Sequence, residues 1–163
     1  MLGDIFTWLL DKVFGGAQRR RNRPNLQIES VDHGPSSMST PAKVWVIIRL
    51  TITNEGRGTA NSYNVAIGVT RENGVHLAFV DSRHPGDATM RQLTNEDVIE
   101  WQSTTPLPHG HSRTLEVRLH MQQGILVPIG VKLKPPGSKT RYREVVVTWH
   151  IGADPQVRLE KET

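Results

Sequence analysis

The stretch VWVIIRLTITNEGRGTANSYNVAIGV, residues 44–69, decides the fold class of this 163-residue chain. Apolar residues recur at every second position from Val44 to Ile52 and again from Val65 to Val69. Such alternation is typical of half-buried β-strands. The segment Asn54–Gly58 between the two runs supplies residues that tolerate the left-handed backbone of a loop. We therefore expect a strand, a loop and a second strand that share one core.

Shorter runs of the same alternation lie on both sides of this pair. They predict further strands over 26–31, 75–80, 98–101, 115–121, 125–133 and 145–151. Composition favours loops over 35–41 and 81–97 and turns over 72–74 and 135–138. Pro128 favours an edge position or a bulge for its strand. Seven to eight short strands at this spacing predict an all-β, antiparallel immunoglobulin-like β-sandwich.

The chain divides by pattern into four segments. We expect an amphipathic helix over 1–16, a basic linker over 17–25, the sandwich over 26–152 and a polar tail over 153–163. The chain has no cysteine, which excludes a disulfide framework, a thiolate zinc site and a cysteine nucleophile. Burial alone must then hold the sandwich, and Trp149 and the alternating stripe from Val44 to Ile52 are its predicted core.

The first residues carry an apolar stripe at helical spacing and then a run of arginines. The stripe comprises Leu2, Ile5, Phe6, Leu9, Leu10 and Val13, is widened by Trp8, and is followed by Arg19, Arg20, Arg21 and Arg23. Residues 1–23 hold five basic and two acidic groups, a net +3 of the chain's +4. The segment is shorter than the roughly 20 apolar residues of a membrane span. Its positive charge follows the apolar run, unlike that of a secretory signal.

Three roles remain open for this helix. It could associate with a protein partner or a second copy, lie in the interface of an anionic membrane, or pack onto its own sandwich. Nucleic-acid binding is disfavoured, because no aromatic residue interleaves the arginines. We expect a cytoplasmic chain, with peripheral attachment to the inner face of the membrane as the alternative.

A family resemblance accompanies these patterns. The segment Leu50–Asn61 followed by Val65–Ile67 resembles the turn-and-strand motif of CARDB-like modules, the cell-adhesion-related immunoglobulin-like domains of bacteria and archaea. The segment Leu107–Val117 is similar to the stretch that enters a later strand in the same family. The resemblance covers roughly residues 26–151. It implies an immunoglobulin-like fold and a binding or spacer role.

Catalytic and metal-binding patterns are weak. His109 and His111 flank Gly110 in a predicted turn, and Asp81, His84 and Asp87 share a polar loop. In a strand, the spacing of His109 and His111 would place both on one face, as metal ligands sometimes are, but Pro108 and Gly110 indicate a turn. A polar surface loop produces clusters such as the second set by chance. No nucleophile elbow, phosphate loop or H-E-x-x-H motif occurs. We therefore predict a non-enzyme without a cofactor or a metal.

Two surface features are candidates for binding. One is a basic hairpin formed by Lys132, Lys134, Lys139, Arg141 and Arg143, which could equally protect strand edges as solubilising charge. The other is Trp45 with Ile47, which should point away from the core if Val44 and Ile48 point into it. That pair is either covered by another segment of the chain or forms an interface.

Overall fold

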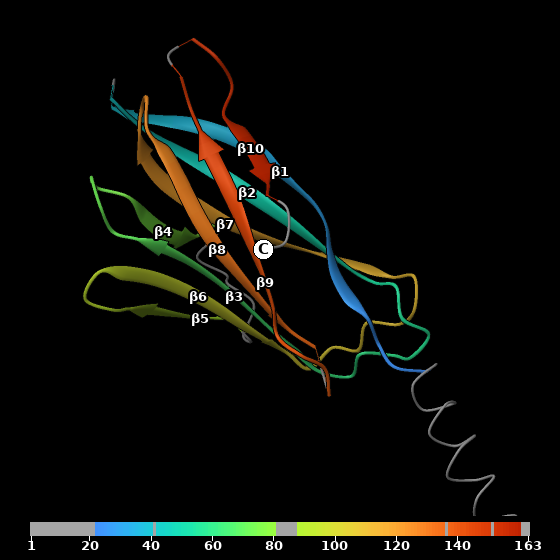
Figure 1. Ribbon diagram of the computed structural model, residues 1–163. Coiled ribbons are helices and arrows are strands. Elements are labelled where there is room, and N and C mark those ends of the chain that lie inside the picture. Colours follow the sequence, from blue (N-terminus) through green and yellow to red (C-terminus); the bar gives the residue numbers. More distant parts are fainter. Residues whose placement is uncertain (1–21, 41, 81–87, 136, 151, 161–163) are drawn as a thin grey trace, which may run out of the picture.

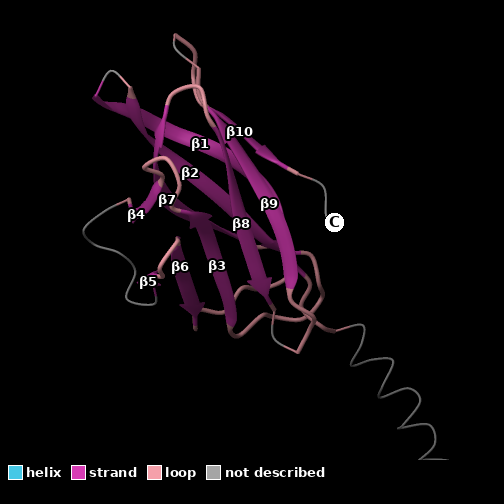
Figure 2. Cartoon of the chain, turned by 60° about the vertical axis from the view of Figure 1, so that its left-hand side comes forward, coloured by secondary structure: helices cyan, strands magenta, loops and turns pink. Residues whose placement is uncertain are grey.

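The computed structural model describes residues 22–40, 42–80, 88–135, 137–150 and 152–160. The all-β class is confirmed, because these residues form strands and loops without a helix (Figures 1 and 2). The described strands are β1 (Leu26–Thr40), β2 (Lys43–Asn54), β3 (Tyr63–Thr70), β4 (His76–Phe79), β5 (Ala88–Gln92), β6 (Glu96–Ser103), β7 (Ser112–Gln122), β8 (Leu126–Lys134), β9 (Arg141–Thr148) and β10 (Gln156–Leu159).

The strands form two antiparallel sheets that enclose one core. One sheet has the order β1-β2-β7-β4 and the other has the order β10-β9-β8-β3-β6-β5. Buried apolar side chains from both sheets belong to a single cluster. The two layers can be followed in Figure 1, where β8 and β9 cross in front of β2 and β7. The architecture is that of a two-layer β-sandwich.

Strand β2 is the best-predicted element. Its residues alternate between buried and half-exposed over their whole length, with Val44, Val46, Ile48, Leu50 and Ile52 on the buried side. The strand pairs with β7 from Lys43 opposite Gln122 to Thr53 opposite Ser112. Trp149 is also buried, and its indole Nε1 donates a hydrogen bond to the Ala153 carbonyl at 3.0 Å. The predicted core stripe and the burial of Trp149 are confirmed.

Asn54 ends β2 inside the protein and organises the loop that follows. Its amide Nδ2 donates to the carbonyls of Gly58 at 2.7 Å and Leu107 at 2.8 Å. Its Oδ1 accepts the backbone N–H groups of Asn25 and Gly56, each at 3.0 Å. The side chain is fully buried and fully satisfied. It thereby fixes the 54–58 loop against the segment through which the N-terminus enters the sandwich.

The predicted loop over 35–41 is wrong for the residues that the structure describes. Strand β1 continues to Thr40 and pairs Ser36 with Val46 and Ser37 with Trp45. A register shift between His33 and Ser36 absorbs Gly34 and Pro35. The strand is at the edge of its sheet, where a residue without an N–H is tolerated.

The predicted loop over 81–97 is also wrong in its second half. Residues 88–92 form β5, an edge strand that pairs with β6, and β6 itself begins at Glu96. Alternation is weak in β5 because Ala88 is its one buried residue. Asp81, His84 and Asp87 lie outside the described residues.

Two further expectations near the C-terminus need correction. β8 lies between β9 and β3, although Pro128 predicted an edge or a bulge. The pairing of β3 with β8 ends at Gly68 and Gly130, so Pro128 pairs with Val146 of β9 alone and lies locally at an edge. The predicted tail over 153–163 contains β10, which pairs with β9. The described strands therefore number ten rather than seven to eight.

Candidate functional site

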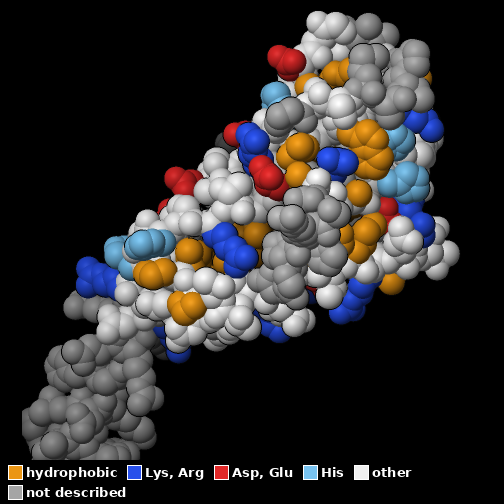
Figure 3. Space-filling view, turned by 180° about the vertical axis from the view of Figure 1, so that it is seen from behind, with side chains coloured by type: hydrophobic (Ala, Val, Ile, Leu, Met, Phe, Trp, Pro, Cys, Tyr) orange, Lys and Arg blue, Asp and Glu red, His pale blue; other side chains and the backbone are white. Residues whose placement is uncertain are grey.

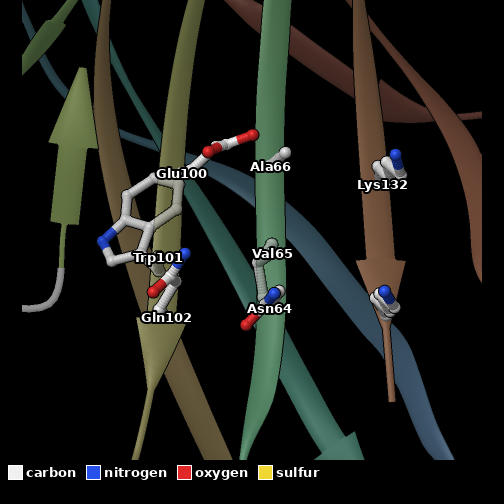
Figure 4. Close-up of a pocket in the computed structure, with 8 residues that line it drawn as sticks. Asn64, Val65, Ala66, Glu100, Trp101, Gln102 and Lys132 are labelled. Carbon is white, nitrogen blue, oxygen red and sulfur yellow. The ribbon is translucent and has the colours of Figure 1, made fainter. Parts of the chain in front are cut away.

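A shallow trough runs along β3 on the outer face of the six-stranded sheet. Its floor consists of Ala66 and Gly68 from β3 and Gly130 from β8, and its hollow holds about 610 Å³. A smaller hollow of about 170 Å³ continues it toward Asn64. Figure 4 shows Glu100 and Gln102 on one side of β3 and Lys132 on the other. Small residues on β3 and at Gly130 of β8, surrounded by longer side chains such as Glu100 and Lys132, produce the depression.

The structure shows no backbone conformation or close contact that requires glycine at the two glycine positions of the floor. The described glycines outside the floor either have a positive φ, as at Gly74 and Gly110, or lie where a Cβ would meet an atom within 3.1 Å, as at Gly34. Gly68 and Gly130 have neither feature: a Cβ would find its nearest atoms at 3.6 and 3.9 Å. The two residues are direct cross-strand partners. Glycine inside a strand is unfavourable for the strand and often marks the close approach of a ligand or another backbone.

Charge is divided across the trough. Glu96 and Glu100 of β6 line one side, and Lys132 and Lys134 of β8 line the other. Glu100 is already paired with Arg91 of β5, 3.0 Å away. Arg91 is exposed and Glu100 is half-buried, and ion pairs near the surface contribute little to stability.

Apolar side chains are exposed on the same face. Leu126 is 58% exposed and Tyr142 is 63% exposed, and both belong to the outward-pointing side of their strands. The Lys132 ammonium lies 5.8 Å from the centre of the Tyr142 ring, within reach of a cation–π interaction. Tyrosine is among the residues enriched at protein interfaces.

The predicted basic hairpin is divided between two environments. Lys132 and Lys134 point outward at the trough, and Lys139 is exposed in the turn between β8 and β9. Arg141 and Arg143 are half-buried, and Arg141 donates to the Asn25 side chain at 2.7 Å. The five residues therefore do not form one basic patch.

Trp45 and Ile47 lie on the outer face of the four-stranded sheet, as their alternation predicts. Both are half-buried. Trp45, His120 and His76 form a row of rings across β2, β7 and β4, with centroids 4.5 and 6.3 Å apart. Arg118 lies 5.8 Å from the Trp45 ring and also donates to the Val80 carbonyl at 3.1 Å. In Figure 3, histidine and hydrophobic side chains lie next to one another on this face.

An ion pair continues that face. Arg49 Nε lies 2.7 Å from Glu116 Oε1. The side-chain hydrogen bond to Glu116 raises the pKa of Arg49, with a smaller opposing effect of desolvation. An arginine is charged at any physiological pH in either case.

Asp97 of β6 is a fully buried carboxylate. Its Oδ2 accepts the Leu77 backbone N–H at 3.1 Å, and Arg71 Nε lies 3.4 Å from Oδ1. His76 Nδ1 lies 3.6 Å from the same carboxylate. Since Asp97 belongs to β6 and Leu77 to β4, these contacts join the two sheets. We assign this cluster a structural role, because a buried carboxylate needs such partners.

The remaining predicted site residues are dispersed. His109 is exposed, and its Nδ1 lies 2.9 Å from the Gly56 carbonyl oxygen, while His111 is exposed nearby. Within the described ranges, no group of three or more histidine, cysteine, aspartate or glutamate side chains is arranged to hold a metal ion. Arg23 is exposed. The helix residues Leu2, Ile5, Phe6, Trp8, Leu9 and Val13, and Arg19, Arg20 and Arg21, lie outside the described residues. In the described part of the chain, no helix has the length and apolarity needed to span a membrane.

The trough itself was missed from the sequence. Its signal is present, because Gly68 and Gly130 interrupt the alternating runs YNVAIGVT and LVPIGVKLK without a turn at either place. A glycine inside a strand pattern indicates a bulge or a close backbone approach. Only the register shows that the two glycines are neighbours.

Comparison with known proteins finds no matching family model and no matching curated protein. Among solved structures, a similar chain carries the description "AvmM Catalyzes Macrocyclization in Alchivemycin A Biosynthesis". It is 16% identical, with 82% of this chain and 92% of that chain covered and a TM-score of 0.40. A likeness at this level does not extend to activity.

Proposed function

We propose that this chain is a non-catalytic binding or assembly module with an immunoglobulin-like β-sandwich. Its docking surface is the outer face of the six-stranded sheet, centred on the trough over β3. The observation that carries this proposal is the pair formed by Gly68 and Gly130, which keeps the centre of the sheet bare where the fold itself leaves room for side chains.

The composition of the trough supports docking rather than catalysis. The described residues that line it include no histidine, serine or cysteine. Its ionisable side chains stand on opposite walls, and Lys132 and Glu144 are exposed to solvent. Catalytic acids and bases are instead usually desolvated and close to one another. The CARDB-like turn motif around Asn54 points the same way, since that family implies binding or spacer modules.

In this proposal residues 1–23 assist the association. Their apolar stripe provides a second contact to a protein partner or another copy. The alternative is a membrane-surface accessory protein that lies on an anionic bilayer through Leu2–Val13 and Arg19–Arg23. The excess positive charge of this segment supports either role, because it attracts acidic proteins and anionic headgroups alike.

The docking surface can be tested with single cysteines, because the chain contains none. Asn64→Cys places a thiol at the trough, and Ser62→Cys places a matched thiol in the exposed loop just before β3. Maleimide labelling rates of both variants are measured in dilute pure protein, in concentrated pure protein and in extract of the cells that produce the chain. We expect the Asn64→Cys thiol to label several-fold more slowly in concentrated protein or in extract than in dilute protein. The Ser62→Cys thiol should label at the same rate in all three conditions. Equal relative rates in all three conditions would contradict the proposal.

A further inference from the structure

We propose that the six-stranded sheet docks onto the same face of a second copy of this chain, related by a twofold axis that runs along β3. This inference rests on the proposed function and deepens it by naming the partner. The supporting observation is how charge and side-chain size are distributed on the two sides of β3. After that rotation, opposite charges face each other, and a larger side chain faces a smaller one.

The register places the relevant residues in two rows across the sheet. In the first row, Ala66 pairs with Glu100 of β6 on one side and with Lys132 of β8 on the other. The second row runs across five strands and contains, in spatial order, Arg91, Val98, Gly68, Gly130 and Glu144. Directly paired residues point to the same face of a sheet, and these residues alternate with the buried ones.

A twofold rotation about β3 superimposes positions that lie equally far from that strand on opposite sides. It brings β6 of one copy over β8 of the other, and β5 over β9. Glu100 then faces Lys132 of the second copy, and Arg91 faces its Glu144. Each contact occurs twice, because an isologous interface repeats every pair.

Side-chain size matches in the same way. The rotation places Val98 over Gly130 of the second copy, so a branched side chain meets the bare floor of the trough. The closest atoms to a Cβ at Gly130 lie 3.9 Å away, which leaves the space over that residue open. Such a projection into a hollow is what close packing of two sheets requires.

The twist of the sheet does not prevent this contact. A regularly twisted sheet has a saddle-shaped surface, and a saddle is unchanged by a twofold rotation about its central strand. Two copies can therefore keep their strands aligned, within the roughly 30° usual for packed sheets, over the whole contact.

Other occupants fit the face less well. A nucleic acid or an anionic membrane would meet Glu96 and Glu100 beside the lysines, and an acidic peptide would meet the same repulsion. A surface with both signs of charge at matched positions is complementary to itself. Strand spacing and rise give an interface of roughly 600 Å² per copy, somewhat below the roughly 800 Å² of a standard interface. We therefore expect a reversible dimer that forms at micromolar concentrations.

The test uses charge reversal and mixing, measured by sedimentation velocity on the full chain across a micromolar concentration range. Lys132→Glu alone creates two Glu–Glu contacts in the homodimer, and Glu100→Lys alone creates two Lys–Lys contacts. We expect each variant to dimerise about tenfold more weakly than the original chain. An equimolar mixture of the two variants restores both contacts in the heterodimer and should recover dimerisation. Lys139→Glu, in the turn between β8 and β9, is the charge-matched control and should dimerise normally.

Rescue on mixing cannot come from altered folding of either variant, because neither chain is repaired by the other unless they touch. A chain that is monomeric at all concentrations, or a mixture that does not recover, would overturn the twofold arrangement. If the thiol of Asn64→Cys is nevertheless protected in cell extract, the docking face stands and its partner is a different molecule. If that thiol is unprotected as well, both the twofold arrangement and the proposed function are wrong.

Discussion

Asn54 shows how much of this sandwich depends on one side chain. Four backbone groups from three separate segments form hydrogen bonds with its side-chain amide, which is fully buried. Two of these groups belong to Gly56 and Gly58, where a Cβ would collide with the backbone of residues 22–25. Asn54 and these two glycines thus act together to hold the N-terminal entry against the loop.

We therefore predict that Asn54→Ala lowers the free energy of unfolding by about 2–4 kcal/mol, because it leaves several buried backbone groups without partners. Urea denaturation followed by tryptophan fluorescence measures this change. Asn61→Ala, in the exposed part of the same connection, is the matched control and should change stability by less than about 0.5 kcal/mol. Equal effects of the two substitutions would show that the amide network is dispensable.

The strands differ in how well the sequence predicts them. β2, β3 and β7 have partners on both sides and bury one face, so their apolar residues alternate cleanly and were found. β5, β10 and the second half of β1 were missed. They lie at sheet edges and bury few side chains, so their backbone pairing leaves little trace in the sequence.

For the candidate site too, the sequence predicts what depends on a single strand and misses what depends on the pairing of strands. The outward direction of Trp45 and Ile47 was predictable, because it depends on parity within one strand. The trough was not, because it depends on the register between β3 and β8, which joins residues more than sixty positions apart. The same register shows that Lys132 and Arg141 point to opposite faces, which a list of nearby basic residues does not reveal.

The N-terminal segment makes its own prediction, which concerns its apolar stripe. If the stripe contacts an anionic membrane, Leu9→Asp should abolish co-sedimentation of the full chain with vesicles that contain phosphatidylserine, because it places a charge in the apolar contact. Thr7→Asp adds the same charge on the expected polar side and is the matched control. Replacing Arg19, Arg20 and Arg21 by Gln should weaken binding to anionic vesicles only, and less so at high salt.

Vesicle binding that withstands all of these substitutions would remove the membrane alternative. Size-exclusion chromatography of Leu9→Asp then reports on the other role of the segment. A helix that contributes to self-association should give a smaller species when its stripe is charged, whereas the Thr7→Asp control should elute unchanged.

Taken as one molecule, the sandwich presents two different outer faces. On the outer face of the four-stranded sheet, the rings of Trp45, His120 and His76 contact one another in a row. Arg49 and Glu116 form an ion pair on the same face. The six-stranded sheet carries a bare floor, exposed Leu126 and Tyr142, and charges of both signs at matched positions. The second face is therefore the one that we propose is completed by another molecule.

The most direct measurement is made on Gly130→Leu, by thermal denaturation and by sedimentation velocity of the same full-length sample. A Cβ at this position meets its nearest atom at 3.9 Å, and glycine is unfavourable inside a strand, so the melting temperature should stay the same or rise. Dimerisation should be lost, because the leucine occupies the space that Val98 of the second copy needs. Thr114→Leu, which adds the same side chain to the outer face of the other sheet, should dimerise normally. A Gly130→Leu chain that dimerises like the original, or that is strongly destabilised, would contradict the claim that this glycine is kept for docking.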